Sequence, residues 1–489
     1  MKKLLIEKND ISTRVALAES GELVEYYVER INTRKIVGNI YKGKVQRIHP
    51  SMEVAFVNIC ADRNAFLYIG ENVEEDSPLE GLTSKKKKVV LNEGDEILCQ
   101  VIKDEFGQKG ARLTLDITLP GRLLVMMPKT DFIGISNKIK DDNRQRLLDI
   151  MNRNRIGSYG YIVRTAAVNS SEEELLAEAI ELKDKWEVIR KKYDNANACC
   201  PVHYEDDLIC RAVRDMLRAD CDEIIINNRV ILDEIKSLNN YRVKTLFCDE
   251  VDLMSRYGLT PQIESLTKKK VVMKNGSSIV IDKVEALTVI DVNTGKYLGL
   301  KYDNLENTVF TTNLLAAEEI ARQLRLRNIG GIIIVDFIDM EEPAHREELM
   351  KRFADCLSRD RVKTTLVGMT NLGLVELTRK KIRSPIGAFM LQKCPYCNGD
   401  GYIHSDEYTL GRIKRALIML FSDSNIKDAV VKVNKQVFNK IIELGYFKSF
   451  KSEIKDINIC FIPDDRLHNE KFIISAEKVN ALPQGAIMI

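Results

Sequence analysis

The strongest constraint on the fold is an alternation of apolar strand segments with an amphipathic helix between residues 277 and 368. Three apolar segments have the length of strands, namely Ile279–Ile281, Leu287–Ile290 and Ile332–Val335. The stretch between the last two carries apolar residues at helical spacing and ends before Gly330. This alternation predicts an α/β sheet, and the continuous apolar run at residues 332–335 predicts a strand that is buried on both faces.

The rest of the chain predicts further units of mixed type. Five short β-rich segments lie between residues 36 and 117, a pattern that is typical of a small barrel. Ser171 and Glu174 form a capping box that begins a helix, and Trp186 belongs to the apolar stripe of that helix. A small α/β region follows Gly401. Because the chain has 489 residues, we expect a multidomain protein with α/β and α+β parts.

Composition excludes several classes of protein. The chain has 74 Lys and Arg residues against 72 Asp and Glu residues, so any nucleic-acid binding must use local positive charge. No apolar run approaches the roughly 18 residues of a membrane-spanning helix, and the run Leu4–Ile6 is too short for a signal peptide. The 11 cysteines are irregularly spaced, which is typical of reduced thiols in a cytoplasmic protein.

Two of the predicted strands end in a carboxylate, at Asp291 and at Asp336. If the strands are neighbours, these carboxylates lie within a few ångströms of each other, and Asn293 lies on the same face as Asp291. Two carboxylates and an amide oxygen suit Mg²⁺ or Mn²⁺, and a water activated by such an ion could attack a phosphodiester. The competing interpretation is that each Asp only caps a turn.

The pair Cys394 and Cys397 has the spacing of half a zinc site. Structural zinc takes four ligands, and His404 could supply a third. The simplest completion is a second chain that contributes its own pair, so that Zn²⁺ lies on a dimer axis. A redox dithiol and two idle thiols are the alternatives.

Two weaker patterns could contact RNA. Phe56 and Phe66 could stack on bases, while Lys44 and Lys109 hold backbone phosphate. From the residues alone, burial of both Phe side chains in the barrel core is the favoured interpretation. The pair Arg164-Thr165 follows a predicted strand, where its guanidinium and hydroxyl could bind a terminal phosphate.

Taken together, these residues resemble the ribonuclease E/G family of bacterial endoribonucleases over nearly the whole chain. The matching segments occur in the order that the family has. They are Asn39–Val45, Ala55–Val57, Leu119–Arg122, Ile162–Ala166, Ser278–Asp282, Glu285–Asn293, Glu319–Arg327, Gly330–Met340 and Cys394–Cys397.

The resemblance implies a fold of six parts. Residues 1–35 plus 206–266 correspond to a structural ribonuclease-H-like domain. An OB-fold RNA-binding β-barrel is inserted into it, and a catalytic domain with a DNase-I-like fold lies further along the chain. The barrel comprises residues 36–117, and the catalytic domain comprises residues 267–388. The remaining parts are the 5′-sensor domain at 118–205, the zinc-link at 389–402 and a small α/β dimerisation domain at 403–489.

The resemblance also implies roles for individual residues. Asp291 and Asp336 match the Mg²⁺ ligands, and Asn293 matches the residue that hydrogen-bonds near the scissile phosphate. Cys394 and Cys397 match the zinc-link, in which two protomers share one Zn²⁺. The remaining matches are Arg164, Thr165, Gly121 and Val125 for an RNA 5′-monophosphate, and Phe56, Phe66 and Lys109 for RNA on the barrel.

The implied reaction is Mg²⁺-dependent cleavage of single-stranded RNA at A/U-rich sites, stimulated by a 5′-monophosphate, which leaves 5′-phosphate and 3′-hydroxyl ends. Its implied roles are maturation of ribosomal and transfer RNA precursors and decay of mRNA in the cytoplasm. We expect a homodimer through the shared zinc, or a dimer of such dimers. We also expect a short, ribonuclease-G-like chain with neither a degradosome scaffold tail nor a membrane segment.

One segment departs from the family, and two other functions compete. Arginines often follow the Gly134–Ser136 motif in the family, whereas Asn137 and Lys138 follow it here. A non-catalytic RNA-binding or ribosome-assembly factor on the same scaffold is the main rival, and the intact pair Asp291 and Asp336 argues against it. An ATPase would require a phosphate-binding G-x-x-x-x-G-K-[ST] loop, which the sequence lacks.

Overall fold

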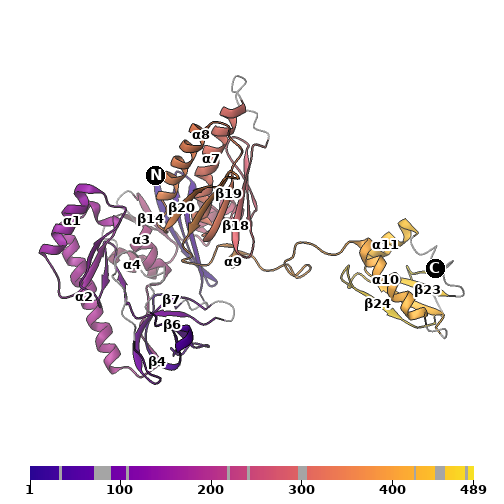
Figure 1. Ribbon diagram of the computed structural model, residues 1–489, viewed down its shortest axis with the longest axis horizontal. Helices are drawn as coiled ribbons and strands as arrows, with labels where there is room; N and C mark the ends of the chain where they lie inside the picture. Colours follow the sequence, from indigo (N-terminus) through magenta and orange to yellow (C-terminus); the bar gives the residue numbers. More distant parts are fainter. Residues whose placement is uncertain are drawn as a thin grey trace. The chain divides into compact units, whose positions relative to one another are not determined.

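The structure of the protein is a computed structural model. The chain forms two compact units, Met1–Met390 and Leu391–Ile489 (Figure 1). Within the described residues the units contain five sheets, and no helix there is long and apolar enough to cross a bilayer. The described residues are 1–31, 36–70, 90–105, 109–216, 221–238, 243–295, 305–422, 426–445, 457–478 and 483–488.

Two distant stretches of the first unit share one mixed sheet with the order β15-β14-β1-β2-β3. Strand β1 pairs in parallel with β14, so Lys3 lies beside Glu223. Apolar residues of both stretches, such as Leu4 and Ile224, are fully buried in a common core. The elements are β1 (Lys2–Lys8), β2 (Ser12–Glu19), β3 (Glu22–Arg30), α3 (Leu208–Met216), β14 (Glu223–Ile226), α4 (Arg229–Leu238), β15 (Lys244–Phe247), α5 (Leu253–Arg256) and α6 (Thr260–Ser265).

The predicted five-stranded barrel is confirmed. Its strands follow the order β4-β5-β6-β8-β7, and pairing of β4 with β7 closes it. Inward-facing Ala55, Val57 and Leu67 alternate with more exposed residues along the strands. The elements are β4 (Ile40–His49), η1 (Pro50–Met52), β5 (Val54–Asn58), β6 (Ala65–Tyr68), β7 (Glu96–Lys103), β8 (Arg112–Thr114) and the added edge strand β13 (Cys200–His203).

A small four-stranded sheet with the order β11-β12-β10-β9 packs against a long helix, α2. The predicted capping box is present, because the Ser171 hydroxyl accepts from the Glu174 N–H and the Glu174 carboxylate accepts from the Ser171 N–H. Trp186 on the predicted stripe is buried. The elements are β9 (Leu119–Pro120), β10 (Leu124–Met127), β11 (Ile133–Ile135), α1 (Asp141–Arg153), β12 (Gly160–Val163), η2 (Thr165–Asn169) and α2 (Glu172–Asn195).

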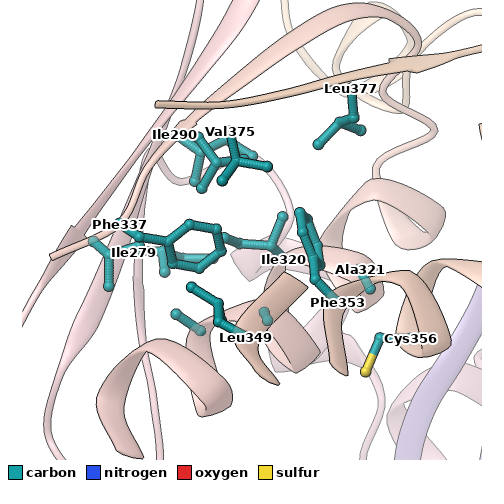
Figure 2. Close-up of a cluster of buried hydrophobic side chains, with 14 of the residues drawn as sticks. Ile279, Ile290, Ile320, Ala321, Phe337, Leu349, Phe353, Cys356, Val375 and Leu377 are labelled. Carbon is teal, nitrogen blue, oxygen red and sulfur yellow. The ribbon is translucent and has the colours of Figure 1, made fainter. Parts of the chain in front are cut away.

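The predicted α/β sheet near residue 300 has six strands in the order β16-β17-β18-β19-β21-β20. Figure 2 shows its core, where Ile290 and Val375 from strands pack with Ile320 and Phe353 from helices. The elements are β16 (Lys270–Val272), β17 (Ser278–Lys283), β18 (Leu287–Asn293), α7 (Leu305–Leu326), β19 (Gly331–Asp336), α8 (Pro343–Ser358), β20 (Thr364–Met369), β21 (Leu374–Arg379) and α9 (Gly387–Met390).

The prediction that the strand at Ile332–Val335 is buried on both faces is wrong. Ile333 and Val335 are fully buried, whereas Ile332 is 50% exposed. The buried residues belong to the core that the sheet shares with α7 and α8, and successive residues of a strand point to opposite faces. An apolar run therefore does not report burial on both faces here, because these two helices pack on the face that carries Ile333 and Val335.

The second unit is a four-stranded sheet, ordered β24-β22-β23-β25, with two helices packed on it. Helix α10 begins at a Ser405 cap that accepts from the Tyr408 N–H, and α11 ends at Gly445 in the left-handed conformation. The elements are α10 (Asp406–Phe421), β22 (Asp428–Val433), α11 (Lys435–Leu444), β23 (Asn458–Pro463), β24 (Phe472–Ser475) and β25 (Ile487–Met488).

Candidate active site and RNA-contacting surfaces

An acidic strand edge is the first candidate site. β18 and β19 are parallel neighbours, and their register places Asp291 directly beside Asp336. The predicted adjacency is therefore confirmed, since paired residues of neighbouring strands lie about 5 Å apart. Both carboxylates are exposed, as is Asn293, whose Nδ2 donates to Asp291 Oδ2 over 2.6 Å.

The donor set at this edge fits a hard divalent cation. Two adjacent carboxylates and an amide oxygen are all-oxygen ligands, and Mg²⁺ commonly uses one or two carboxylates together with water and phosphate. In the described part of the chain no ion pair neutralises Asp291 or Asp336, so their charges are available to a cation. The described residues contain no group of three or more His, Cys, Asp and Glu side chains placed to hold a metal, so water and substrate would complete the shell.

The loop after Asp336 is held by side chains that the sequence did not single out. Fully buried Asn313 on α7 donates to the Ile338 carbonyl over 2.8 Å and accepts from the Ile338 N–H over 3.1 Å. Arg346 Nε donates to the Met340 carbonyl over 2.8 Å. Two contacts from α7 and α8 therefore fix the backbone that leaves the acidic strand edge. The only sequence signal was a polar residue within the buried stripe of α7.

A second candidate site surrounds Arg164, which follows β12. Arg164 Nη2 donates to Asp215 Oδ1 over 2.8 Å, and Nη1 donates to the Gly121 carbonyl over 2.5 Å. Exposed Thr165 shares a 3.3 Å hydrogen bond with Ser136. Arg164 and Thr165 line a pocket of about 910 Å³, which we call the outer pocket. The other residues that line it are Arg122, Ser136, Lys138, Ile162, Val163, Ala166, Val168, Asn169, Ser170, Glu174, Arg214, Asp215, Ser358, Arg359, Asp360 and Arg361.

Neighbouring charges determine the ionisation of Asp215 in the wall of the outer pocket. Burial would raise the pKa of Asp215, but Arg214 and Arg164 outweigh that effect, so the pKa of this carboxyl lies below its usual range. Arg164 is therefore held by a partner that stays ionised. Lys138, from the segment that departs from the family, donates to the carbonyls of Ser358 and Asp360 over 3.1 and 2.5 Å. This contact ties the wall of the pocket to the end of α8.

Gly121 and Val125 do not line the outer pocket, although both lie next to residues that do. The Gly121 carbonyl positions Arg164, and a Cβ on Gly121 would lie 2.0 Å from Glu178 Oε1. Glu178 accepts from the Leu123 N–H over 2.9 Å, and burial raises the pKa of its carboxyl. Val125 lies on β10 opposite Ile162. These two predicted residues therefore lie next to the pocket, with backbone and packing contacts.

The barrel presents a row of basic and aromatic residues. Strand register pairs Arg47 with Phe56, Phe56 with Phe66, Phe66 with Arg112, and Arg112 with Lys103. Since directly opposed residues share a face, this row crosses all five barrel strands. Proteins that bind single-stranded nucleic acid commonly combine guanidinium and ammonium groups with aromatic rings. Arg47, Arg112 and Lys103 were not singled out from the sequence.

The interpretation that both Phe side chains are barrel core is wrong. Phe56 and Phe66 are half-buried, while their neighbours Ala55, Val57 and Ala65 are fully buried. The alternation of β5 and β6 gives the core to small residues and directs the rings outward. Lys44 on β4 and Lys109 before β8 are both exposed, but they lie outside the row.

The cysteine pair lies at the start of the second unit. The backbone N–H groups of Cys397 and Tyr396 lower the pKa of the Cys394 thiol. Cys397 Sγ accepts from the Gly401 N–H over 3.3 Å. Hydrogen bonds from backbone N–H groups to sulfur favour the thiolate, which is the form that binds zinc. The two thiols therefore fit two of the four ligand positions of a tetrahedral zinc site.

His404 has another partner and does not complete the set in one chain. Its Nδ1 lies 2.7 Å from Glu470 Oε1, and its ring stacks on Tyr408 at 4.8 Å. The Tyr396 ring between the two cysteines packs at 4.0 Å from His468, whose Nε2 contacts the Tyr396 carbonyl over 2.7 Å. These contacts anchor the cysteine loop to the second unit.

Comparison with known proteins places this geometry in one family. The model of the ribonuclease E/G family matches residues 118–382, which include the acidic strand edge and the Arg164 pair. The chain belongs to the ribonuclease E/G family. Ribonuclease G of Haemophilus influenzae is 36% identical over 452 residues, which cover 90% of this chain and 92% of that protein. Ribonuclease G of Escherichia coli strain K12 is 36% identical over 428 residues, or 85% of this chain and 87% of that protein.

The family resemblance extends to longer members. Ribonuclease E of Haemophilus influenzae is 34% identical over 507 aligned positions, which cover 99% of this chain and 53% of that protein. The chain therefore spans about half the length of this ribonuclease E and nearly the full length of the ribonuclease G relatives.

Proposed function

We propose that this member of the ribonuclease E/G family is a divalent-metal-dependent endoribonuclease that cleaves single-stranded RNA. The observation that carries the proposal is the side-by-side register of Asp291 and Asp336 at an exposed sheet edge. A metal site of this kind is typical of enzymes that hydrolyse phosphodiesters. The family match across this edge and the names of the relatives support the same reaction class.

Each residue at the acidic strand edge has a proposed task. Asp291 and Asp336 would hold a Mg²⁺ or Mn²⁺ ion. When bound, such an ion would polarise the phosphodiester and favour deprotonation of a bound water. Asn293 orients Asp291 through its 2.6 Å hydrogen bond and has a second amide N–H that can donate to a phosphate oxygen. The products would carry 5′-phosphate and 3′-hydroxyl ends.

The barrel and the outer pocket would bind the RNA. We propose that bases stack on Phe56 and Phe66 while Arg47, Arg112 and Lys44 hold the backbone, which selects unpaired strands. Cleavage at A/U-rich sites is proposed from the family resemblance. The guanidinium of Arg164 and the hydroxyl of Thr165 would bind an RNA 5′-monophosphate, which would stimulate cleavage. Gly121 would act through its carbonyl. The targets we propose are ribosomal and transfer RNA precursors and mRNA.

The supporting architecture is proposed along the same lines. The sheet formed by β1–β3 with β14 and β15 would be a structural ribonuclease-H-like domain, and the sheet formed by β16–β21 would be a DNase-I-like catalytic domain. The second unit would dimerise.

We further propose that Cys394 and Cys397 share one Zn²⁺ with the same pair of a second chain, since two thiolates leave two of four zinc positions open. Cys394→Ala is expected to halve the molecular mass measured by light scattering and to remove zinc from the purified protein. Cys60→Ala, at an exposed cysteine of the barrel, is the matched control. An unchanged mass in a zinc-free Cys394→Ala protein would refute the shared site.

The experiment that tests the proposed function is cleavage of a short A/U-rich single-stranded RNA in Mg²⁺ and in excess chelator. Two substrates that differ only in a 5′-monophosphate or a 5′-hydroxyl are compared. We expect cleavage only with Mg²⁺, faster for the monophosphate, and absent in Asp336→Ala. Glu348→Gln, at an exposed carboxylate on α8, is the control for charge removal elsewhere in the unit.

The possible outcomes separate the parts of the proposal. Equal rates for the two substrates would retain the nuclease and remove the 5′-end sensor. Binding of RNA without any cleavage would favour the RNA-binding or ribosome-assembly factor instead.

A further inference from the structure

A second, smaller cavity lies next to the outer pocket in the first unit. Its volume is about 240 Å³, and we call it the inner cavity. Arg164, Asp215, Asp360 and Arg361 contribute to the walls of both spaces. Six arginines and three carboxylates line the inner cavity, so its wall carries excess positive charge. The charged residues are Arg164, Arg211, Arg325, Arg361, Arg379, Arg383, Glu25, Asp215 and Asp360.

Four of the six arginines are neutralised by a carboxylate. Arg164 pairs with Asp215 over 2.8 Å, and Arg379 pairs with Asp360 over 2.8 Å. The other two pairs join Arg211 to Glu29 over 2.5 Å and Arg361 to Glu25 over 3.3 Å. Every carboxylate in the wall is therefore already engaged by an arginine.

Arg325 and Arg383 have no such partner. Within the described ranges, neither guanidinium forms an ion pair or a hydrogen bond. Arg383 lies over the Tyr27 ring at 4.3 Å, a cation–π contact that uses none of its N–H donors in a hydrogen bond. Burial lowers the pKa of both arginines, which means that the folded protein holds their charges at a cost. Asp360 and Glu25 act on Arg325 through space, and Glu29 and Asp215 act on Arg383, but each of these carboxylates is bonded to another arginine. Arginine stays protonated under such conditions, so an external anion can complete the compensation.

We propose that the inner cavity binds a phosphate-class oxyanion through Arg325 and Arg383. Guanidinium groups present N–H donors in a planar fork that matches phosphate oxygens. The cavity volume of 240 Å³ is below the roughly 300–1,000 Å³ of ordinary small-molecule sites, which favours a compact anion over a whole nucleotide. This inference does not depend on the proposed ribonuclease activity.

Two arginine-rich segments of the sequence are a partial signal for this site. Arg325 belongs to the segment Arg322–Arg327, and Arg383 follows the basic run Arg379–Lys381. Arg322 itself forms an ion pair with Glu319 over 2.9 Å. Arg325 and Arg383 are therefore the residues of these two arginine-rich segments that face the inner cavity without a carboxylate partner, whereas Arg379 in the same wall is paired with Asp360.

The test is titration calorimetry of the full chain with inorganic phosphate at constant ionic strength set by potassium chloride. Arg325→Gln and Arg383→Gln remove one inner guanidinium each. Arg359→Gln is the matched control, and Thr165→Val weakens the proposed 5′-phosphate site of the outer pocket so that the two sites can be told apart. Both residues line the outer pocket but not the inner cavity. Uridine 5′-monophosphate is the second probe and tells free phosphate from a nucleotide phosphate.

We expect a phosphate site that persists in Thr165→Val, where the proposed 5′-phosphate site of the outer pocket is weakened, and in Arg359→Gln. Each inner variant should weaken that binding roughly tenfold or more, because a charge-assisted hydrogen bond is lost. Uridine 5′-monophosphate should bind this site more weakly than phosphate. Phosphate binding that is unchanged in both inner variants, or that disappears in Thr165→Val, would overturn the proposal. Stronger binding of the nucleotide at the inner arginines would overturn the assignment to a compact anion.

A thermal melt checks that the variants report binding rather than misfolding. Without phosphate, Arg325→Gln should melt at least as high as the parent protein, because an unpaired, partly buried charge is removed. With phosphate, the parent should gain melting temperature and Arg325→Gln should not. An equal loss with and without phosphate would mean that Arg325 is only structural.

Discussion

The acidic strand edge brings like charges together, whereas the outer pocket pairs opposite charges. Asp291 and Asp336 are like charges brought together by neighbouring strands of one sheet, and both are exposed. Around the outer pocket, Arg164 and Arg214 come from separate segments and are each paired with Asp215. The first site lacks compensating charge until a cation binds. In the second, Asp215 already compensates Arg164 and Arg214 before any ligand binds.

This difference teaches what each site can do. Two uncompensated carboxylates favour a divalent cation, and under the proposed function the site would gain its chemistry only when that cation binds. A preformed network of ion pairs fixes the position of Arg164 before any ligand arrives, which suits recognition. We therefore expect substitutions at the acidic edge to abolish the rate and substitutions at the pocket to change the preference between substrates.

The largest effect is expected from Asp291→Asn. Loss of one carboxylate should reduce the cleavage rate roughly 1,000-fold or more, because the metal supplies several kcal/mol of transition-state stabilisation and each ~1.4 kcal/mol is tenfold in rate. RNA binding, measured by fluorescence anisotropy in chelator, should change less than about threefold, since the barrel is untouched. Mg²⁺-dependent cleavage at the parental rate would show that the acidic edge is not the active site.

The next effect concerns the loop after Asp336. Asn313→Ala should lower the rate roughly tenfold at low Mg²⁺ and less at saturating Mg²⁺, because the Ile338 backbone loses both partners and Asp336 loses a fixed neighbour. Its stability should fall by about 1–3 kcal/mol. Thr312→Val is the control, since the buried Thr312 hydroxyl bonds only within α7, to the Thr308 carbonyl. Equal Mg²⁺ dependence in both variants would restrict Asn313 to a structural role.

A smaller effect, on preference rather than rate, is expected at the outer pocket. Arg164→Gln should lower the ratio of cleavage rates for 5′-monophosphate and 5′-hydroxyl RNA toward one, a loss of roughly tenfold if one charge-assisted hydrogen bond is removed. The rate for the 5′-hydroxyl substrate should stay near that of the parent. Arg153→Gln, at an exposed arginine on α1, should leave the ratio unchanged. A preserved ratio in Arg164→Gln would place the 5′ end elsewhere.

The smallest effect is a pH dependence behind the pocket. Burial raises the pKa of the Glu178 carboxyl in the folded protein, so its ionisation costs stability as pH rises above its unfolded pKa of about 4.3. Glu178→Gln keeps an acceptor for the Leu123 N–H and should melt slightly higher than the parent at pH 7.5. The gain should disappear near pH 4.5. Glu181→Gln, at an exposed position on the same helix, should show neither change.

Much of the local structure could be predicted from the sequence. The barrel strands and the Ser171 capping box depend on short-range patterns, namely strand alternation and helix capping. The adjacency of Asp291 and Asp336 depends on a longer-range inference, that the strands before and after one helix are neighbours in a sheet. The acidic edge was predictable because two neighbouring strands of one sheet determine its geometry.

The features that could not be predicted depend on contacts between distant segments. Which face of the strand at Ile332 is open depends on where α7 and α8 pack, which the apolar run itself does not encode. Phe56 and Phe66 point outward because Ala55 and Ala65 fill a small barrel interior, which composition does not reveal. The pairing of Arg164 with Asp215 joins residues 51 positions apart. The family resemblance suggested roles for such residues but not their partners.

The central claim is that Asp291 and Asp336 together bind a divalent cation. Its most direct test is an anomalous difference map from crystals of the protein soaked in Mn²⁺, compared with crystals of Asp291→Asn treated identically. We predict one manganese peak about 2.0–2.2 Å from carboxylate oxygens of both residues, lost in the variant. Manganese bound elsewhere, with none at the acidic edge of a protein that cleaves RNA in Mn²⁺, would contradict the claim.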